Sequence, residues 1–190
     1  METTGERVRD AALELFAERG YHGTGIRQLA ERAGLSSASL YHYMGTKEDL
    51  LVAIMRESLE RLVGEAMTLI AEQSAPPQQV AALVRMHVRA HAERPRETRV
   101  VDGEVGALEA GTREEIIGLR DRYEQIWQGV IDAGIDAGEF HVGSPSVARR
   151  ALLEMCSGVA RWYDDGGALS LDALADQYAE MGLRLLVGPS

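Results

Sequence analysis

Five hydrogen-bonding side chains stand close together between positions 37 and 44: Ser37, Ser39, Tyr41, His42 and Tyr43. Their hydroxyl and imidazole groups donate and accept hydrogen bonds, which is how proteins contact base edges and phosphate oxygens. An ordinary core helix would not carry so many polar groups on so few turns. The segment therefore suggests recognition of a polar surface rather than burial.

Lys47 follows at the predicted start of the next helix, where its charge and the exposed backbone amides can meet a phosphate. The formal net charge of −10 argues at first sight against a nucleic-acid partner. From position 20 to position 47, however, the chain carries three basic residues and one acidic one, namely Arg27, Arg32, Lys47 and Glu31. An acidic body with a locally basic tip suits a protein that touches DNA at one end.

The elements that must position these residues are helices. Apolar residues recur at helical spacing over about 4–19, 26–33, 37–44, 47–73 and 80–91, and again over 171–187. Pro95 opens a weaker segment, a capping box at Thr112–Glu115 predicts a long helix, and Ser144 with Pro145 predicts another that runs to about Tyr163. No segment alternates with a period of two. The fold class is therefore all-α, with about nine helices.

Residues 26–47 form the most informative arrangement: a helix, a Gly34-Leu35-Ser36 turn, a second helix, and then Thr46 and Asp49 as a capping box for the long helix. Short helices joined by a three-residue turn that contains glycine are typical of helix-turn-helix units, whose second helix enters the major groove. On periodicity alone, a plain pair of antiparallel helices with a polar surface explains the pattern equally well.

A set of residues at fixed spacing decides between these two interpretations: RVRDAA at 7–12, FAERGY at 16–21, GT at 23–24, Ile26, Ala30, AGLS at 33–36, SLYHYM at 39–44 and KEDLL at 47–51. In order, spacing and residue type, residues 7–55 resemble the N-terminal module of the tetracycline-repressor (TetR) family. The resemblance implies an N-terminal three-helix bundle with a helix-turn-helix, joined by a long helix to a larger helical domain for ligand binding and dimerisation. The expected domains are residues 1–50 and 51–190.

The family's DNA-contacting positions correspond here to Thr24, Arg27, Ser37, Ser39, Tyr41, Tyr43 and Lys47. The resemblance implies that Thr24, Tyr41 and Lys47 mainly hold phosphates, and that Ser37 and Ser39, with His42 and Tyr43, read bases. The family's first helix often follows a basic arm, whereas Glu2 and Glu6 stand here, which argues against minor-groove contacts from an arm. The implied partner is an operator with pseudo-twofold symmetry, bound by a homodimer whose last two long helices form the interface.

The candidate ligand-contacting residues lie on the fifth and seventh helices and at the end of the eighth: Met86, His87, His91, Tyr123, Trp127 and Trp162. Each also has a structural interpretation, because aromatic residues at helical spacing are more often core, and Trp162 could serve dimer contact instead. His87 and His91, four residues apart, could approach one metal ion, but no further cysteine or carboxylate triplet accompanies them, and no metal site is predicted.

Residues 99–104, 119–124 and 160–167 are similar to one branch of the family, which controls fatty-acid or steroid breakdown and responds to acyl-coenzyme A thioesters. The resemblance implies an acyl-CoA effector. Asp164 and Asp165 depart from that branch, which often has a basic residue and a proline before the glycines.

Other classes of protein find little support in the sequence. There is no glycine-rich phosphate loop or nucleophile elbow, and Cys156 lies in an apolar stretch, so we expect neither an enzyme nor a cofactor. A helical interaction module without a DNA role would not need the polar segment at 37–44. No apolar run is long enough for a membrane span and the N-terminus does not resemble a signal peptide, so we expect a cytoplasmic protein.

Overall fold

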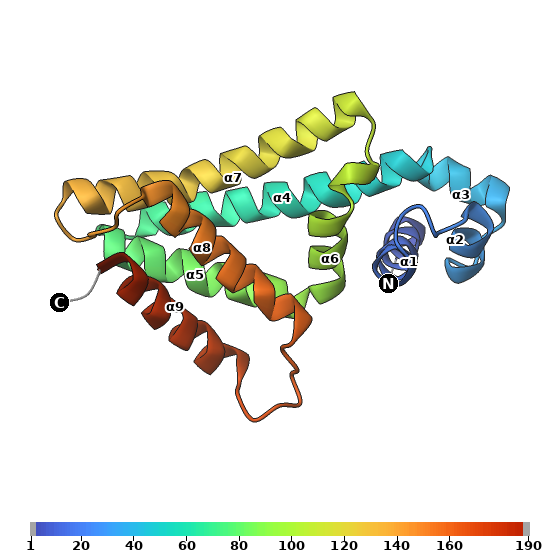
Figure 1. The fold of residues 1–190 in the computed structure, drawn as a ribbon. Helices are drawn as coiled ribbons and strands as arrows, with labels where there is room; N and C mark the ends of the chain where they lie inside the picture. The colour runs from blue at the N-terminus through green and yellow to red at the C-terminus, as the bar shows by residue number, and fades with distance from the viewer. Residues whose placement is uncertain (1–2, 188–190) are drawn as a thin grey trace. The chain divides into compact units, whose positions relative to one another are not determined.

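The computed structural model describes residues 3–187, and within this range every regular element is helical (Figure 1). Its elements are nine α-helices and two short 3₁₀-helices. They are α1 (Thr4–Arg19), α2 (Ile26–Arg32), α3 (Ser37–Met44), α4 (Lys47–Glu72), α5 (Pro76–Glu93), α6 (Pro95–Gly103), η1 (Val105–Ala107), α7 (Ala110–Asp136), α8 (Pro145–Ser157), η2 (Gly158–Arg161) and α9 (Leu171–Val187).

The chain forms two compact units. The first, called here the N-terminal unit, contains the residues up to Leu59 together with Arg96–Leu119, and the second, the C-terminal unit, contains Glu60–Pro95 and the residues from Arg120 onwards. The helices α4 and α7 each begin in the N-terminal unit and end in the C-terminal unit. The functional boundary expected between residues 50 and 51 concerns DNA-binding and ligand-binding roles, and it stays a prediction.

The core of the N-terminal unit is built by α1, α2, α3 and the start of α4, and α6 and the start of α7 pack against it. Its fully buried side chains include Leu15, Phe16, Leu29, Leu40 and Leu51. Within each helix the buried residues lie at helical spacing, as Leu40 and Met44 do on α3, so each short helix is held by burial of one apolar face rather than by intrinsic propensity.

The start of α1 bears on the expected arm. Glu6 belongs to a capping box with Thr3 at the first turn of α1, with the Glu6 amide donating to the Thr3 hydroxyl at 3.2 Å. Glu6 is therefore part of a helix rather than of an arm, and Glu2 lies outside the described residues.

The core of the C-terminal unit forms around α5, along which α9 lies, as Figure 1 shows. Trp127 and Phe140 are its largest fully buried side chains, at 0% and 2% exposure. Gly134 on α7 admits the Phe140 ring so closely that a Cβ at this glycine would lie 2.1 Å from Phe140 Cδ2. Leu174 on α9 is 2% exposed and belongs to the same core.

Two predicted helix boundaries are wrong. The long helix α7 begins at Ala110 rather than at Thr112, because the Thr112 hydroxyl is engaged by a Glu48 carboxylate oxygen at 2.6 Å and does not cap the helix. The helix α8 ends at Ser157 rather than near Tyr163, because Gly158–Arg161 tighten into a 3₁₀ turn. Ser144 precedes α8 as predicted, although its hydroxyl makes no capping hydrogen bond.

Of the helices in residues 3–187, none combines the length and the apolar character that crossing a membrane requires.

Candidate functional sites

The turn between α2 and α3 is closed by local hydrogen bonds. Gly34 adopts a φ of +68°, a left-handed conformation that glycine enters without strain, and the Leu35 amide donates to the Ala30 carbonyl at 2.8 Å. Ser36 then caps α3, since its hydroxyl accepts a hydrogen bond from the Ser39 amide at 3.1 Å. Residues 26–44 therefore form the helix-turn-helix that the sequence predicts.

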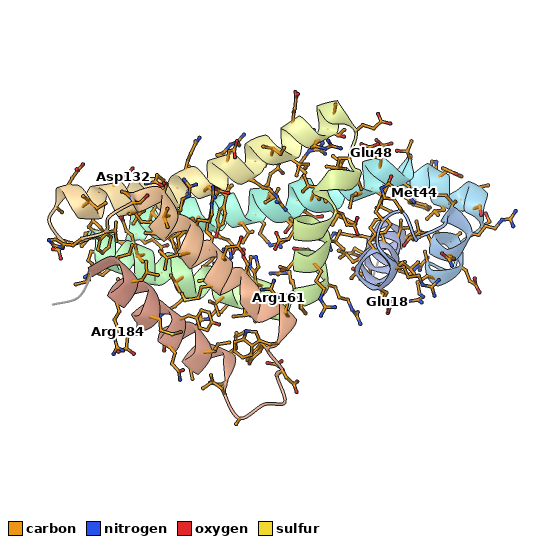
Figure 2. All side chains as sticks on the ribbon, in the orientation of Figure 1. Glu18, Met44, Glu48, Asp132, Arg161 and Arg184 are labelled. Atoms are coloured by element: carbon orange, nitrogen blue, oxygen red, sulfur yellow. The ribbon has the colours of Figure 1, made fainter. Side chains whose placement is uncertain are left out.

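The helix α3 is anchored by two side chains and exposes the others. Leu40 and Met44, the latter labelled in Figure 2, are 0% and 5% exposed and face the core of the N-terminal unit. Tyr41 and Tyr43 are 52% and 51% exposed. Ser39 and His42 are exposed and Ser37 is half-buried. The exposed residues present the hydroxyl and imidazole groups that a reading helix requires.

Two of the residues predicted to contact phosphates form hydrogen bonds within the protein. Thr24 is 1% exposed, and its hydroxyl lies 2.9 Å from the Gly20 carbonyl and 3.2 Å from the Leu15 carbonyl, to which it can donate. Lys47 donates to the carbonyl oxygens of Tyr21 and Thr24 at 2.8 and 2.9 Å, and burial lowers its pKa. These two residues shape the turn between α1 and α2, and Thr24 could contact DNA only through its backbone.

Arg27, by contrast, is exposed near the start of α2. The structure thus divides the predicted DNA-binding residues into two groups. The exposed residues can reach a ligand as they stand: Arg27, Ser39, Tyr41, His42 and Tyr43. The buried or half-buried residues hold the module in shape or stand at its edge: Thr24, Ser37 and Lys47.

Sequence reasoning missed the carboxylates that tie this module to residues 96–119 of the same unit. Glu104 accepts a hydrogen bond from the Tyr21 amide at 3.1 Å. Glu48, labelled in Figure 2, accepts from the Glu109 amide at 2.8 Å. These partners lie more than sixty positions apart in the chain, so no local pattern in the sequence could have paired them.

A second cluster joins α5 and α7 inside the C-terminal unit, and it contains four of the predicted ligand-contacting residues. The His87 ring lies between two hydroxyl groups, with Nδ1 2.8 Å from the Tyr123 hydroxyl and Nε2 3.0 Å from the Ser157 hydroxyl. His91 stacks on His87 at a centroid distance of 3.9 Å, and Trp127 meets the His87 ring edge-on. The structure therefore brings His87, His91, Tyr123 and Trp127 together.

The other two candidates lie outside this cluster. Met86 lines a groove of about 750 Å³ between α4 and α5, and Trp162 is 55% exposed beyond α8. Ser157 is the member of the cluster that the sequence analysis did not name, although a hydroxyl beside the buried Cys156 was a signal for a polar contact.

The electrostatics of the cluster follow from burial. Desolvation, with a smaller effect of the neighbouring His91, holds the pKa of His87 well below its ordinary value, so this imidazole is neutral at pH 7. Burial also raises the pKa of the Tyr123 hydroxyl and raises that of the Cys156 thiol to about 12. His87, Tyr123 and Cys156 are consequently uncharged at pH 7.

The arrangement of His87 and His91 does not support a metal ion bound between them. Both ring nitrogens of His87 face hydroxyl groups, and His91 Nδ1 donates to the His87 carbonyl at 2.9 Å. Across residues 3–187 no three side chains of His, Cys, Asp or Glu converge on a position where they could hold a metal ion.

Comparisons with known proteins match both parts of the chain. Residues 8–54 match the family described as bacterial regulatory proteins of the tetR family, and residues 73–186 match a tetracyclin repressor-like C-terminal domain. The chain belongs to the TetR family of regulators. This membership makes it a regulatory protein rather than an enzyme.

Individual relatives of this TetR-family protein agree along nearly its whole length. The transcriptional repressor KstR2 of Rhodococcus jostii is 32% identical over 182 residues, which cover 95% of this chain and 89% of KstR2. A tetR-family regulatory protein from Rhodococcus RHA1 superposes with a TM-score of 0.90 at 27% identity, covering both chains completely. The structure of AibR in complex with isovaleryl coenzyme A and operator DNA shares the fold, with a TM-score of 0.84 at 22% identity over 99% of this chain and 100% of AibR.

Proposed function

We propose that this TetR-family protein is a dimeric transcriptional repressor that binds operator DNA through α3 and releases it when a small molecule binds the C-terminal unit. The observation that carries the proposal is the face of α3, where Ser39, Tyr41, His42 and Tyr43 are exposed while Leu40 and Met44 fix the helix from behind. A helix held in this way can enter the major groove without losing its own packing. Its place of action is the cytoplasm, where the DNA lies.

Exposed apolar residues on the last two long helices support the dimeric state. Val147 on α8 is 65% exposed, and Met181 and Leu185 on α9 are 43% and 39% exposed. Exposed apolar side chains on two helices that pack together are well suited to an isologous interface, in which the same residues of two subunits meet. Two copies of α3 would then read the two halves of a pseudo-palindromic operator.

The effector class that we propose is an acyl-CoA thioester. The structurally similar AibR binds isovaleryl coenzyme A, and the uncharged polar cluster of His87, Tyr123 and Ser157 gives the C-terminal unit groups that can recognise a polar molecule. A ligand can release DNA only if it binds the non-binding conformation more tightly than the DNA-binding one.

The experiment that tests the proposal is a gel shift with the purified protein on DNA from upstream of its own gene, together with a random duplex library. We expect a shift that weakens steeply with salt, because binding releases phosphate counterions, and that one thioester of an acyl-CoA panel reverses. A shift that no thioester reverses would reject the effector class and keep the DNA assignment. Failure to select any sequence from the library at low salt would reject the repressor function.

A further inference from the structure

Glu104 holds the turn between α1 and α2 from a position 83 residues after Tyr21 in the chain. Its carboxylate accepts a hydrogen bond from the Tyr21 amide at 3.1 Å, and the negative charge of the acceptor strengthens this bond. The backbone of Glu104 is itself fixed between α6 and η1, because its amide donates to the Val100 carbonyl at 3.1 Å and its carbonyl accepts from the Ala107 amide at 3.0 Å. Glu104 is therefore an acceptor with a well-defined position in the N-terminal unit.

Gly20, which precedes Tyr21, lets the carboxylate approach the turn closely. Its φ is +74°, in the left-handed region that favours glycine. A Cβ at Gly20 would lie 3.3 Å from Glu104 Oε1, closer than ordinary van der Waals contact. Glycine meets both requirements at once, so the carboxylate and the turn fit tightly together.

Lys47 binds the other backbone group of Tyr21. Its ammonium group donates to the Tyr21 carbonyl oxygen at 2.8 Å and to the Thr24 carbonyl oxygen at 2.9 Å. The amide and the carbonyl of one residue are separated only by its φ and ψ rotations, which are the soft dihedrals of the backbone. Because Glu104 fixes the amide and Lys47 is bound to the carbonyl, loss of the first contact frees the direction of the second.

The sign of the charge separates this positioning effect from simple electrostatics. Glu104 is negative and DNA is a polyanion, so removal of this carboxylate should by itself strengthen DNA binding. If Glu104 instead holds the turn that orients Lys47, its removal should weaken DNA binding. The two explanations therefore predict opposite changes in affinity.

We propose that Glu104 is a positioning residue for DNA binding: by fixing the Tyr21 amide, it directs the Tyr21 carbonyl toward Lys47 and so holds the Lys47 ammonium group where it contacts a DNA phosphate. The proposal rests on the DNA binding proposed above. It adds a residue that acts on the phosphate contact through the backbone of the turn.

Three variants test the role of the hydrogen bond, on a duplex that the wild type selects from a random library. Glu104→Ala removes the acceptor and should weaken binding about tenfold. Glu104→Gln keeps an oxygen that can accept from the Tyr21 amide and should restore binding. Glu114→Ala removes an exposed carboxylate of the same unit and should bind at least as tightly as the wild type. Fluorescence anisotropy measures the affinities, and equal losses in Glu104→Ala and Glu104→Gln would overturn the proposal.

A double-mutant cycle with Lys47→Ala provides a readout that a merely structural role would not change. In the Lys47→Ala background, Glu104→Ala should weaken binding by less than about twofold, because the contact that it positions is already lost. Glu104→Ala alone should lower the slope of log K against log salt by about one, and the slope should not fall further in the double variant. A purely structural defect would reduce the folded fraction in both backgrounds and leave the slope unchanged.

The outcomes separate the role of Glu104 from the repressor function. Wild-type affinity of Glu104→Ala, or equal losses in the two Lys47 backgrounds, would overturn the role of Glu104 and leave DNA binding standing. If urea denaturation shows that Glu104→Ala does not fold, Glu104→Asp, whose carboxylate is one methylene shorter, replaces it in the same cycle with the same expected signs. If the wild type selects no DNA sequence, the repressor function is wrong, and the role of Glu104 fails with it.

Discussion

The ammonium group of Lys47 lies over the ring of Tyr21, 4.2 Å from its centroid, and donates a 2.8 Å hydrogen bond to the carbonyl oxygen of the same residue. A second hydrogen bond of 2.9 Å reaches the Thr24 carbonyl. Lys47 is the only lysine in the chain, and from the start of α4 it closes the turn between α1 and α2. Two of its three N–H groups are used in this way, which leaves one for a phosphate.

Lys47→Ala should therefore have two effects. It should lower the free energy of unfolding by about 1–3 kcal/mol, because two carbonyl oxygens lose a charged donor. It should also weaken binding to every DNA sequence to a similar extent and lower the slope of log K against log salt by about one. Chemical denaturation and fluorescence anisotropy at several salt concentrations measure these effects, with the exposed Arg122→Ala as the charge-matched control. An unchanged salt slope would rule out the phosphate contact.

Ser39 should affect sequence preference rather than overall affinity. Its hydroxyl lies 2.9 Å from that of Ser36 on the exposed surface, so Ser36 helps to fix the orientation of this hydroxyl. Ser39→Ala should change the preferred base at one position of each half-site by about 1–3 kcal/mol, as selection from a randomised duplex library would reveal. The exposed Ser74→Ala is the matched control. Identical selected sequences for Ser39→Ala and the wild type would contradict the reading role.

The ion pair of Arg9 with Glu97, between α1 and α6, should contribute more to the free energy of unfolding than the exposed pair of Arg9 with Glu57. Arg9 bonds the nearly buried Glu97 at 2.7 Å and the exposed Glu57 at 3.0 Å. Glu97→Gln should lower the free energy of unfolding by about 2–3 kcal/mol, because it leaves a half-buried guanidinium without its main partner. Glu57→Gln should cost less than about 1 kcal/mol, since that carboxylate is 63% exposed. Equal losses in urea denaturation would mean that burial does not set the strength of these pairs.

The boundaries that the sequence predicts correctly are those determined by local contacts. Ser36 caps α3 three residues before its partner, and Thr46 and Asp49 exchange hydrogen bonds of 2.8 and 3.0 Å, as a capping box requires. Such contacts join positions three apart, so residue types alone reveal them. The same reasoning fails at Thr112, because its hydroxyl donates a hydrogen bond to Glu48, which lies 64 positions away in the sequence.

The two candidate sites show the same contrast between local contacts, which the sequence reveals, and long-range contacts, which it does not. The exposed face of α3 could be read from the alternation of Leu40 and Met44 with polar residues, since a helix fixes which side chains share a face. The pairing of His87 with Tyr123 and Ser157 depends on how α5, α7 and α8 pack, and helical periodicity does not determine which faces meet. The sequence therefore indicated His87, His91, Tyr123 and Trp127 as candidates. It could not separate them from Met86, which also lies on α5, or from Trp162.

Gly134 should be the least replaceable glycine of α7. A Cβ there would lie 2.1 Å from Phe140 Cδ2, and Phe140 is 2% exposed, so the ring cannot move aside without disturbing the core. Gly134→Ala should lower the free energy of unfolding by about 3 kcal/mol or more. Gly118→Ala on the same helix meets no atom within 4 Å and should stabilise the protein by about 0.5–1 kcal/mol. Thermal and urea unfolding of the two variants would test the contrast, and similar effects of both would contradict the close packing.

His87 should make stability depend on pH in the mildly acidic range. Burial holds its pKa far below the value of about 6.5 that it has in the unfolded chain. As the pH falls below about 6.5, His87 binds a proton in the unfolded chain but not in the folded protein. The free energy of unfolding should therefore fall, by up to about 1.4 kcal/mol per pH unit from this residue, and above that pH the residue contributes no dependence.

His87→Gln should flatten this dependence between about pH 5 and pH 6.5, because the amide cannot take up the proton. His141→Gln, at an exposed position, should leave it unchanged. Urea denaturation at a series of pH values measures the slopes. If His87→Gln and the wild type lose stability equally as the pH falls, the imidazole is already protonated in the folded protein, and the polar cluster around Trp127 would carry a charge.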